Sequence, residues 1–391
     1  MRFGVNYTPS RGWFHHWLDL DLEAVRADFH QIAALGLDHV RIFPLWPLLQ
    51  PHRGLIRRSA VEDVGRVVDV AASAGLDVQV DVLQGHLSSF DFYPTWLQTW
   101  HRRNVFTDPD VVAAQADLVR TVAAAMADRP NLLGLTLGNE LNNLVAHNPV
   151  TSDEVDAWLD RMLAACYAAD PAHPHVHSVY DATWYSDDHP FTPRASVTKG
   201  AMTTVHPWVF SGDCAGRYGP LAPQTTHLAE YVVELAKAYA DDPGRQVWVQ
   251  EVGAPEPHIP GEHAAEFATR TLRNVLTCEG VWGVTWWCSH DVDRRLLDFP
   301  PLEYTLGLLA NDGSDKPLAT AYAKIAAEEH VPSRRTSALV FDGTRSNSAP
   351  GGAFFEAWMR QAAAGRRPAI VLADRADDAG HLAARGIEEV S

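Results

Sequence analysis

The sequence predicts an α/β protein: a (β/α)8 TIM barrel over residues 1–330, followed by a small α/β subdomain over 331–391. Short apolar, β-branched runs alternate eight times with stretches of helical periodicity along the first 330 residues. This alternation indicates parallel strands joined by right-handed crossovers, and eight rounds of it close a barrel. A chain of 391 residues is long enough for one barrel and a small appendage.

Each strand and helix follows from its local pattern. Gly36 and Gly75 close the first two helices, because glycine favours the position just after a helix end. Pro190 and Pro193 make segment 181–200 a poor helix former, so the helix after the fifth strand should be short or missing. The expected strands are 3–7, 38–43, 76–82, 132–137, 175–179, 202–206, 246–250 and 281–287. The expected helices are 21–35, 59–74, 111–127, 153–169, 227–240, 262–277 and 318–329.

The loops that follow the strands are unequal in length, and barrel active sites lie on this face. Other than the longest, the long loops are 142–152, 181–200, 207–226 and 289–316. The longest loop, 84–108, contains the aromatic residues Phe90, Phe92, Tyr93, Trp96 and Trp100. These side chains either shape a pocket or pin the loop to the barrel, and the sequence leaves both interpretations open.

The C-terminal segment changes character after residue 331. Strands are expected at 337–341, 368–372 and 387–390, with helices at 353–364 and 377–385. This βαβαβ pattern resembles half of a nucleotide-binding fold, but it lacks a G-x-G-x-x-G fingerprint and a phosphate loop. We therefore expect the segment to pack against the barrel or a partner subunit and not to bind a nucleotide.

Composition excludes several classes of partner. The formal net charge of −17 argues against nucleic acid, because phosphate binding needs clustered lysine and arginine. No apolar stretch reaches the ~18 residues of a membrane span, so no membrane association is expected. The N-terminus reads as a strand and not as a signal peptide, and the four cysteines are scattered. These features favour a cytoplasmic protein with reduced thiols and a small neutral ligand.

Histidine-rich segments raise the question of a metal. His15 and His16 are adjacent, and His173, His175 and His177 alternate along a predicted strand edge, but no acidic or cysteine partner is evident for either group. We expect no metal and no cofactor.

Two glutamates stand where catalytic carboxylates are found in barrels. Glu140 and Glu251 each follow an apolar strand directly, where a carboxylate is rigidly held and poorly solvated. A purely structural alternative for the pair Asn139-Glu140 is a helix N-cap followed by an acidic residue in the first turn. Two such glutamates in an eight-fold strand and helix pattern favour a glycosidase.

A family resemblance supports this interpretation. Residues 32–46, Ile-Ala-Ala-Leu-Gly-Leu-Asp-His-Val-Arg-Ile-Phe-Pro-Leu-Trp, resemble the second-strand region of family 5 glycoside hydrolases, which are retaining (β/α)8 enzymes, as does Gly-Asn-Glu at 138–140 after the fourth strand. The resemblance covers about residues 1–328. It implies that Glu140 is the acid/base, that Glu251 is the nucleophile, and that Asn139 holds the sugar 2-hydroxyl. The substrate-binding residues that it implies or that adjoin its motifs are Arg41, Trp46, His86, Asn139, His206, Trp208 and Trp287.

One position departs from the family pattern. The family usually has His-x-Tyr after the sixth strand, and its tyrosine bonds the nucleophile, whereas this chain has His206-Pro-Trp208. The hydrogen bond must therefore come from elsewhere or be absent. Of Trp286 and Trp287 only one can reach the barrel lumen, because neighbouring strand residues point to opposite faces.

The resemblance also implies a mechanism and a substrate. In a retaining enzyme the two carboxylates lie ~5–5.5 Å apart, one attacking the anomeric carbon while the other protonates the leaving oxygen. We expect Arg41 to lower the pKa of Glu251, while burial and the neighbouring negative charge raise that of Glu140. Residues 4–17 resemble actinobacterial family members related to β-mannosidases. This predicts an exo-β-mannosidase acting on small oligosaccharides such as mannosyl-β-1,4-N-acetylglucosamine, with a homodimer as a weaker expectation.

Other activities remain open. A β-glucosidase, a β-galactosidase or an endo-mannanase could occupy the same barrel, and a non-catalytic sugar-binding barrel is a second alternative.

Overall fold

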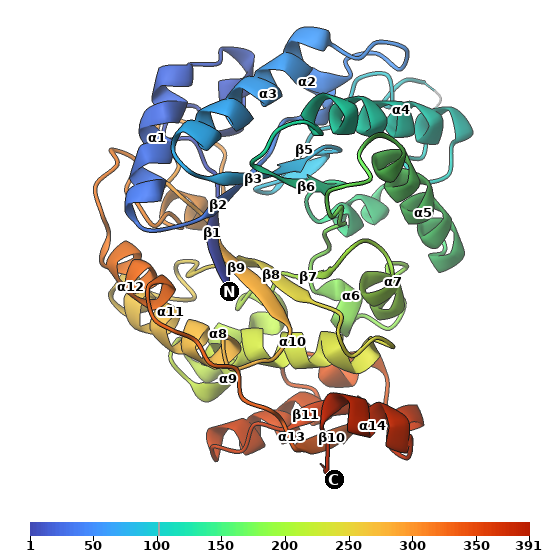
Figure 1. The fold of residues 1–391 in the computed structure, drawn as a ribbon, viewed down its shortest axis with the longest axis vertical. Helices are drawn as coiled ribbons and strands as arrows, with labels where there is room; N and C mark the ends of the chain where they lie inside the picture. The colour runs from blue at the N-terminus through green and yellow to red at the C-terminus, as the bar shows by residue number, and fades with distance from the viewer. Residues whose placement is uncertain (101) are drawn as a thin grey trace.

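The computed structural model describes residues 1–100 and 102–391 and confirms the predicted barrel (Figure 1). Within these residues, seven parallel strands form a curled sheet in the order β6-β3-β2-β1-β9-β8-β7. Consecutive strands pair side by side from β1 to β3 and from β7 to β9, as right-handed crossovers require. The strands are β1 (Arg2–Asn6), β2 (His39–Ile42), β3 (Asp77–Asp81), β6 (Leu132–Thr136), β7 (Thr203–Val205), β8 (Val247–Val252) and β9 (Val281–Trp286).

The expected fifth strand is wrong as a regular strand. At that place Val176 forms a single parallel bridge to Thr136 of β6, and the carbonyl of His175 accepts from the amide of Ala201 before β7 (2.8 Å). The ladder stops there because the next residues bond to a loop: the carbonyl of Ser178 accepts from Leu141 (3.2 Å). This short link still closes the ring between β6 and β7.

Helices surround the sheet, and their starts follow the sequence. The Asp21 side chain caps α1, Asp108 caps α4, and Thr151 with Glu154 forms a capping box at α5. The outer helices are α1 (Leu22–Ala34), α3 (Arg58–Ser73), α4 (Pro109–Met126), α5 (Ser152–Ala169), α10 (Leu228–Tyr239), α11 (Gly261–Val275) and α12 (Pro317–Ala326). Shorter helices are α2 (Trp46–Leu49), α6 (Ala182–Tyr185), α7 (Pro193–Thr198), α8 (Cys214–Tyr218) and α9 (Pro223–Thr226). The prediction of only short helix after the fifth strand is confirmed by α6 and α7.

Loops on the carboxyl-end face contain further short elements. A two-stranded hairpin follows β3, and short 3₁₀ helices follow β1, β6, β7 and β9. These elements are β4 (His86–Leu87), β5 (Phe90–Asp91), η1 (Trp13–Leu18), η2 (Leu141–Ala146), η3 (Ser211–Asp213) and η4 (Pro301–Tyr304).

The C-terminal segment forms a small parallel sheet, β11-β10-β12, that lies against α10 on the outside of the ring (Figure 1). Tyr231 of α10 packs on Phe355 and Trp358 of this unit. The expected strand and helix pattern is therefore present. Its elements are β10 (Ser337–Phe341), η5 (Arg345–Ser348), α13 (Ala353–Ala363), β11 (Ala369–Leu372), η6 (Ala373–Arg375), α14 (Ala379–Arg385) and β12 (Glu389–Val390).

Membrane insertion has no support in the helices of the structure. In the described part of the chain, every helix is too short or too polar to cross a bilayer.

Candidate active site

A cavity of about 540 Å³ opens at the carboxyl ends of the barrel strands. This volume is within the range of small-ligand sites. The side chains that line it come from the loops after most of the strands, so they are brought together only by closure of the barrel. They include His86, Ser88, Asn139, Glu140, Asn143, Tyr180, Asp181, Tyr185, Trp208, Phe210, Ser211, Glu251, Trp287 and Glu303.

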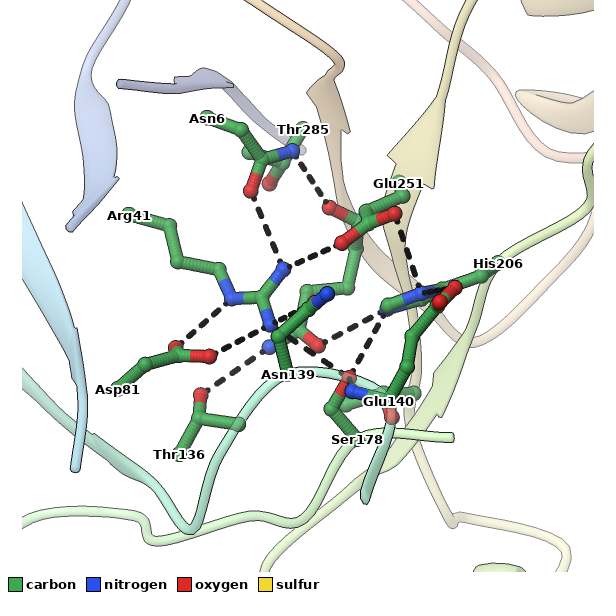
Figure 2. Close-up of polar contacts among 12 residues, drawn as sticks. Asn6, Arg41, Asp81, Thr136, Asn139, Glu140, Ser178, His206, Glu251 and Thr285 are labelled. Carbon is green, nitrogen blue, oxygen red and sulfur yellow. Dashed lines mark hydrogen bonds and ion pairs between the residues drawn. The ribbon is translucent and has the colours of Figure 1, made fainter. Parts of the chain in front are cut away.

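Arg41 at the end of β2 organises the floor of the cavity (Figure 2). Its guanidinium donates two hydrogen bonds to Asp81 at the end of β3, at 2.9 and 2.8 Å. It also donates to the carboxylate of Glu251 (2.9 Å) and to the amide oxygens of Asn139 (2.8 Å) and Asn6 (3.2 Å). Because the oxygen of Asn139 faces Arg41, its NH2 group remains to donate toward the cavity.

The backbone around Glu140 has an unusual conformation that depends on its neighbours in the sequence. The preceding Gly138 admits no side chain, because a Cβ there would lie 2.4 Å from the carbonyl oxygen of Leu83. Glu140 itself adopts left-handed dihedrals (φ 42°), which are strained for a residue with a Cβ and cluster at functional sites. The N-cap alternative is wrong for Asn139, whose side-chain oxygen accepts from Arg41, and the Glu140 side chain makes no capping bond to the following helix η2. Instead it accepts from the amide of Asn143 (3.1 Å).

Trp208 fills the position at which the chain departs from the family pattern. Its indole Nε1 donates to Oε2 of Glu251 (3.2 Å), so the hydrogen bond expected from a tyrosine comes from a tryptophan. Room for the indole depends on Gly253, since a Cβ there would lie 2.9 Å from the Trp208 ring. Gly253, two residues after Glu251, therefore matters to the support of that carboxylate.

His206 joins the two glutamates (Figure 2). Its Nδ1 lies 2.8 Å from Glu140 and 3.3 Å from Glu251, and its Nε2 lies 3.2 Å from the amide oxygen of Gln250. One atom each of Glu140, His206 and Glu251 lies within 4.8 Å of the other two. The carboxylates are thus close enough for direct attack, whereas an inverting enzyme holds them ~6.5–9.5 Å apart to admit a water.

The pKa order expected from the sequence is wrong. Burial raises the pKa of Glu251, and Arg41 and His206 do not overcome it. Burial also opposes ionisation of Glu140, but the hydrogen bond and charge of His206 outweigh it, so the pKa of Glu140 is lowered. Burial likewise disfavours the charged imidazole, yet the pKa of His206 is raised because Glu251 and Glu140 both face Nδ1. Between Glu140 and His206, these directions therefore favour the ion pair, with the proton on the imidazole.

The same three side chains have the spacing of a metal site. A cation there would lie beside the guanidinium of Arg41, 2.9 Å from Glu251, which disfavours it. Among the other histidines, His173 and His175 do have an acidic neighbour that the sequence did not suggest, since both contact Asp170 at the end of α5. These contacts account for the two imidazoles without a ligand.

Of the remaining residues predicted to bind substrate, two line the cavity and one does not. Trp287 and His86 line the cavity, and His86 is fixed by Asp91 (2.8 Å). Trp286 points away from the cavity onto Tyr322 of α12, as expected for one of the two. The prediction for Trp46 is wrong: it is fully buried, donates to Gln50 (3.0 Å) and packs in the core, because α2 turns the chain inward after β2.

The aromatic side chains of loop 84–108 mainly pin the loop. Phe90 and Phe92 pack on Phe14, Trp96 contacts Trp46, and Trp100 is fully exposed. None of the five lines the cavity, whereas Ser88 of the same loop does. Residue 101 of this loop lies outside the described residues.

Several residues of the site were missed by sequence reasoning. Asp81 carried the same signal as Arg41, a charged residue at the end of a buried strand, and could have been found that way. Ser88 lies in an irregular loop, and Asp181 and Tyr185 lie at the two ends of the four-residue helix α6, so neither segment is long enough for periodicity to show which side chains turn inward. Glu303 lies in η4, within the long loop 289–316, and nothing in the sequence placed it in the cavity.

Comparison with known proteins identifies the arrangement. The family model for cellulase (glycosyl hydrolase family 5) matches residues 4–290. A GH5_18 protein from Streptomyces cattleya, solved as a glutamate-to-alanine variant in complex with Manβ1-4GlcNAc, is 60% identical with a TM-score of 0.97, covering 100% of this chain and 98% of the other.

A second relative has the same ligand. A GH5_18 glutamate-to-alanine variant from Bifidobacterium longum subsp. longum in complex with Manβ1-4GlcNAc is 46% identical with a TM-score of 0.97, covering 100% of this chain and 95% of the other. An exo-β-1,4-mannosidase from an Opitutaceae bacterium shares the fold at 22% identity and a TM-score of 0.81 over 96% of this chain and 70% of the other. No curated protein matches the sequence.

Proposed function

Since the chain belongs to glycosyl hydrolase family 5 and is a glycoside hydrolase, we propose that it is a retaining, exo-acting β-mannosidase. Its proposed substrates are small β-1,4-linked mannosides such as mannosyl-β-1,4-N-acetylglucosamine. Support for the substrate comes from the two relatives with bound Manβ1-4GlcNAc, which match this chain over its full length. Support for the chemistry comes from one observation above others: the carboxylates of Glu140 and Glu251 face each other within 4.8 Å across one cavity.

In the first step Glu251 attacks the anomeric carbon of the mannosyl unit. The glycosidic C–O bond breaks, and the leaving oxygen takes a proton from Glu140. Arg41 and Trp208 both donate to the carboxylate of Glu251, so they orient it for attack. The NH2 group of Asn139 is placed to donate to the sugar 2-hydroxyl, and the indole of Trp287 provides the surface for the sugar ring.

We propose that His206 passes the proton for this step to Glu140. Nδ1 of His206 lies 2.8 Å from Glu140, so transfer along this hydrogen bond gives a protonated glutamate and a neutral imidazole. Nε2 keeps its own proton on the amide oxygen of Gln250. No proton has to be taken from solvent, since the total charge of the site does not change.

In the second step water hydrolyses the glycosyl-enzyme. Glu140, now a carboxylate, accepts a proton from the water, whose oxygen attacks the anomeric carbon and releases Glu251. The product keeps the β configuration.

The exo mode of action is supported by the walls of the cavity. Trp13 and Phe43 pack on Trp287 at ring distances of 6.3 and 5.5 Å, within a cluster of buried aromatic side chains from the loops after β1, β2 and β9. This cluster packs behind Trp287, and we propose that it blocks a longer chain of sugars on that side.

The experiment that tests the proposal compares 4-nitrophenyl β-mannoside, β-glucoside and β-galactoside with mannosyl-β-1,4-N-acetylglucosamine. We expect the mannosides to have the highest kcat/KM, and proton NMR to show β-mannose as the first product. Faster turnover of another glycoside would indicate a β-glucosidase or β-galactosidase. If mannan is added as a further substrate, its internal cleavage would indicate an endo-mannanase. Absence of turnover on every substrate would favour a sugar-binding barrel.

The acid/base role has its own variant. Glu140→Gln should lower kcat/KM for the disaccharide by about 10²–10⁴-fold, because the leaving sugar needs a proton. The loss on nitrophenyl mannoside should be much smaller, since nitrophenolate leaves without one. Glu262→Gln, at an exposed glutamate of α11, is the matched control. Equal losses on both substrates would contradict the assignment.

A cytoplasmic location and a homodimer stay predictions from the sequence, as does the division into two domains at residue 330.

A further inference from the structure

The C-terminal unit has no part in the mechanism above, yet it contacts two segments of the cavity wall. The first wall segment, residues 180–191, contains α6, and the second wall segment, residues 208–212, follows β7; both contribute residues that line the cavity. Helix η5 of the C-terminal unit packs against α6. Just after η5, Pro350 lies so close to the second wall segment that a Cβ at Gly212 would be 3.1 Å from its ring. The unit therefore supports both segments from outside the cavity.

Arg345 of η5 makes most of the polar contacts to the first wall segment. Its guanidinium donates to the carbonyls of Thr183 (3.2 Å) and His189 (3.3 Å), and also to that of Asp187. Thr183 belongs to α6, whereas the other two residues follow it. One planar group with several donors thus connects this short helix with the irregular chain after it.

The neighbours of Arg345 complete the attachment. The hydroxyl of Ser346 donates to Oδ2 of Asp187 (2.8 Å), and the Ser346 amide donates to Oδ1 of the same carboxylate (3.1 Å). Helix η5 is itself fixed to the barrel, because the Tyr231 hydroxyl of α10 donates to the carbonyl of Ser348 (2.8 Å). The first wall segment is therefore bonded through η5 to one of the long outer helices.

Both wall segments lead directly to the glutamates of the site. Tyr180, which precedes α6, exchanges two hydrogen bonds with Asn142, the second residue after Glu140: its amide donates to the Asn142 side chain (2.9 Å), and its carbonyl accepts from that side chain (3.1 Å). The second wall segment begins with Trp208, whose indole donates to Glu251 (3.2 Å). A shift of either segment would therefore be felt at the reacting groups.

We propose that η5 of the C-terminal unit holds the two wall segments in their ligand-binding geometry, with Arg345 as the positioning residue. Binding to a wall that is already ordered costs less free energy than binding to one that the ligand must order. Arg345 is not among the residues that line the cavity, so it acts through the backbone carbonyls that it holds. The inference rests on the proposed hydrolase function for its kinetic measurement.

The test removes the guanidinium and keeps the apolar part of the side chain. For Arg345→Met, we expect KM for mannosyl-β-1,4-N-acetylglucosamine to rise about tenfold and kcat to stay within about threefold of wild type, because saturating substrate restores the order of the wall. Amide hydrogen exchange over residues 180–191 of the free protein, followed by mass spectrometry, should become faster. Arg345→Lys keeps the charge and one donor group and should recover part of the lost affinity.

Arg367→Met is the matched control. Arg367 also belongs to the C-terminal unit and also bonds the barrel, but its partners are Asn274 (2.6 Å) and Thr277 (3.1 Å), neither of which lines the cavity. This variant should leave KM and the exchange over residues 180–191 unchanged. Ser346→Ala, which removes a single side-chain hydrogen bond to Asp187, provides the same comparison with a smaller effect should Arg345→Met fold poorly.

Two results would overturn the proposal. One is an unchanged KM in Arg345→Met, even with faster exchange, because the wall would then not need this support to bind a ligand. The other is an equal rise of KM in Arg345→Met and Arg367→Met, which would indicate a general loosening of the C-terminal unit. If the wild-type enzyme prefers another glycoside, KM is measured for that glycoside, and if it turns over none, calorimetric affinity for the disaccharide replaces KM. Failure of the mannosidase proposal and failure of the positioning role therefore give different results.

Discussion

Two clusters of buried charge in this protein use the same residue types with opposite results. At the barrel mouth, Arg41 bonds Asp81 and Glu251, and Glu140 lies next to them. Between α10 and the C-terminal sheet, Arg335 bonds Glu230 at 2.6 Å, and the carboxylate is also 2.6 Å from His227. The first cluster opens into a cavity, whereas the second is enclosed by packed side chains.

The balance of charge separates the two clusters. At the interface, four cations face the two glutamates of α10: Lys237 and Arg385 lie near Glu234, and Arg335 and Arg367 near Glu230. Although burial opposes ionisation, the charges of Lys237, Arg335 and Arg385 lower the pKa of Glu234. At the mouth the carboxyls outnumber the cations. The cations therefore do not offset burial, which raises the pKa of Glu251 and raises that of Glu303 to about 7.

This difference shows which surroundings allow a buried carboxylate to act in catalysis. A glutamate surrounded by cations is ionised, inert and stabilising. A glutamate with too few cations and an open side can change its protonation state or attack a ligand.

The largest expected effect comes from one substitution made in both clusters. Glu251→Gln should lower kcat by on the order of 10⁴-fold or more, because it removes the proposed nucleophile. The free energy of unfolding of the Glu251→Gln variant should hardly fall, since Arg41 keeps both hydrogen bonds to Asp81. Glu234→Gln at the interface is the control and should lower stability while leaving kcat close to wild type. Kinetics and urea unfolding measure the two effects, and retained activity in Glu251→Gln would exclude the nucleophile assignment.

The next effect concerns stability. Arg335→Met leaves the fully buried Glu230 without its closest cation and should lower the free energy of unfolding by about 3 kcal/mol. The kcat of the folded protein should not change, because neither Arg335 nor Glu230 lines the cavity. Arg334→Met, at the exposed neighbouring position, should have little effect on urea unfolding. A loss below about 1 kcal/mol for Arg335→Met would mean that the interface contributes little to stability.

A third effect, similar in size to the second, is a pH dependence of stability. Burial raises the pKa of Glu303 from 4.5 to about 7, so between these values the folded protein binds more protons than the unfolded chain. Stability therefore falls as pH rises from about 4.5 to 7. Glu303→Gln removes this dependence, and the variant should gain on the order of 3 kcal/mol over wild type between pH 5 and 8. Urea unfolding across this range measures it, and parallel curves for the two proteins would contradict the shift.

Glu234 reverses that dependence. Its lowered pKa means that its contribution to stability is present above the unfolded pKa and is lost as pH falls through the folded value. The two clusters should therefore weaken at opposite ends of the pH range.

Much of the site could be predicted from strand ends. Arg41, Glu140 and Glu251 each lie at or just after the carboxyl end of a buried parallel strand, and closure of the barrel brings such ends together. Residues in irregular loops could not be predicted in this way. Trp46 shows the limit, because it follows a strand end directly and yet α2 turns it into the core.

By itself the sequence determined the barrel, its helix starts and the residues at its strand ends, because these depend on local periodicity, capping and strand order. Only the tertiary structure decided that Trp208 supports Glu251, that Arg345 of the C-terminal unit holds the loop containing Asp181, and that His206 lies between two carboxylates. These contacts join segments far apart in the chain. Their geometry, and with it the pKa order of the glutamates, depends on distances of a few ångströms that no local pattern encodes.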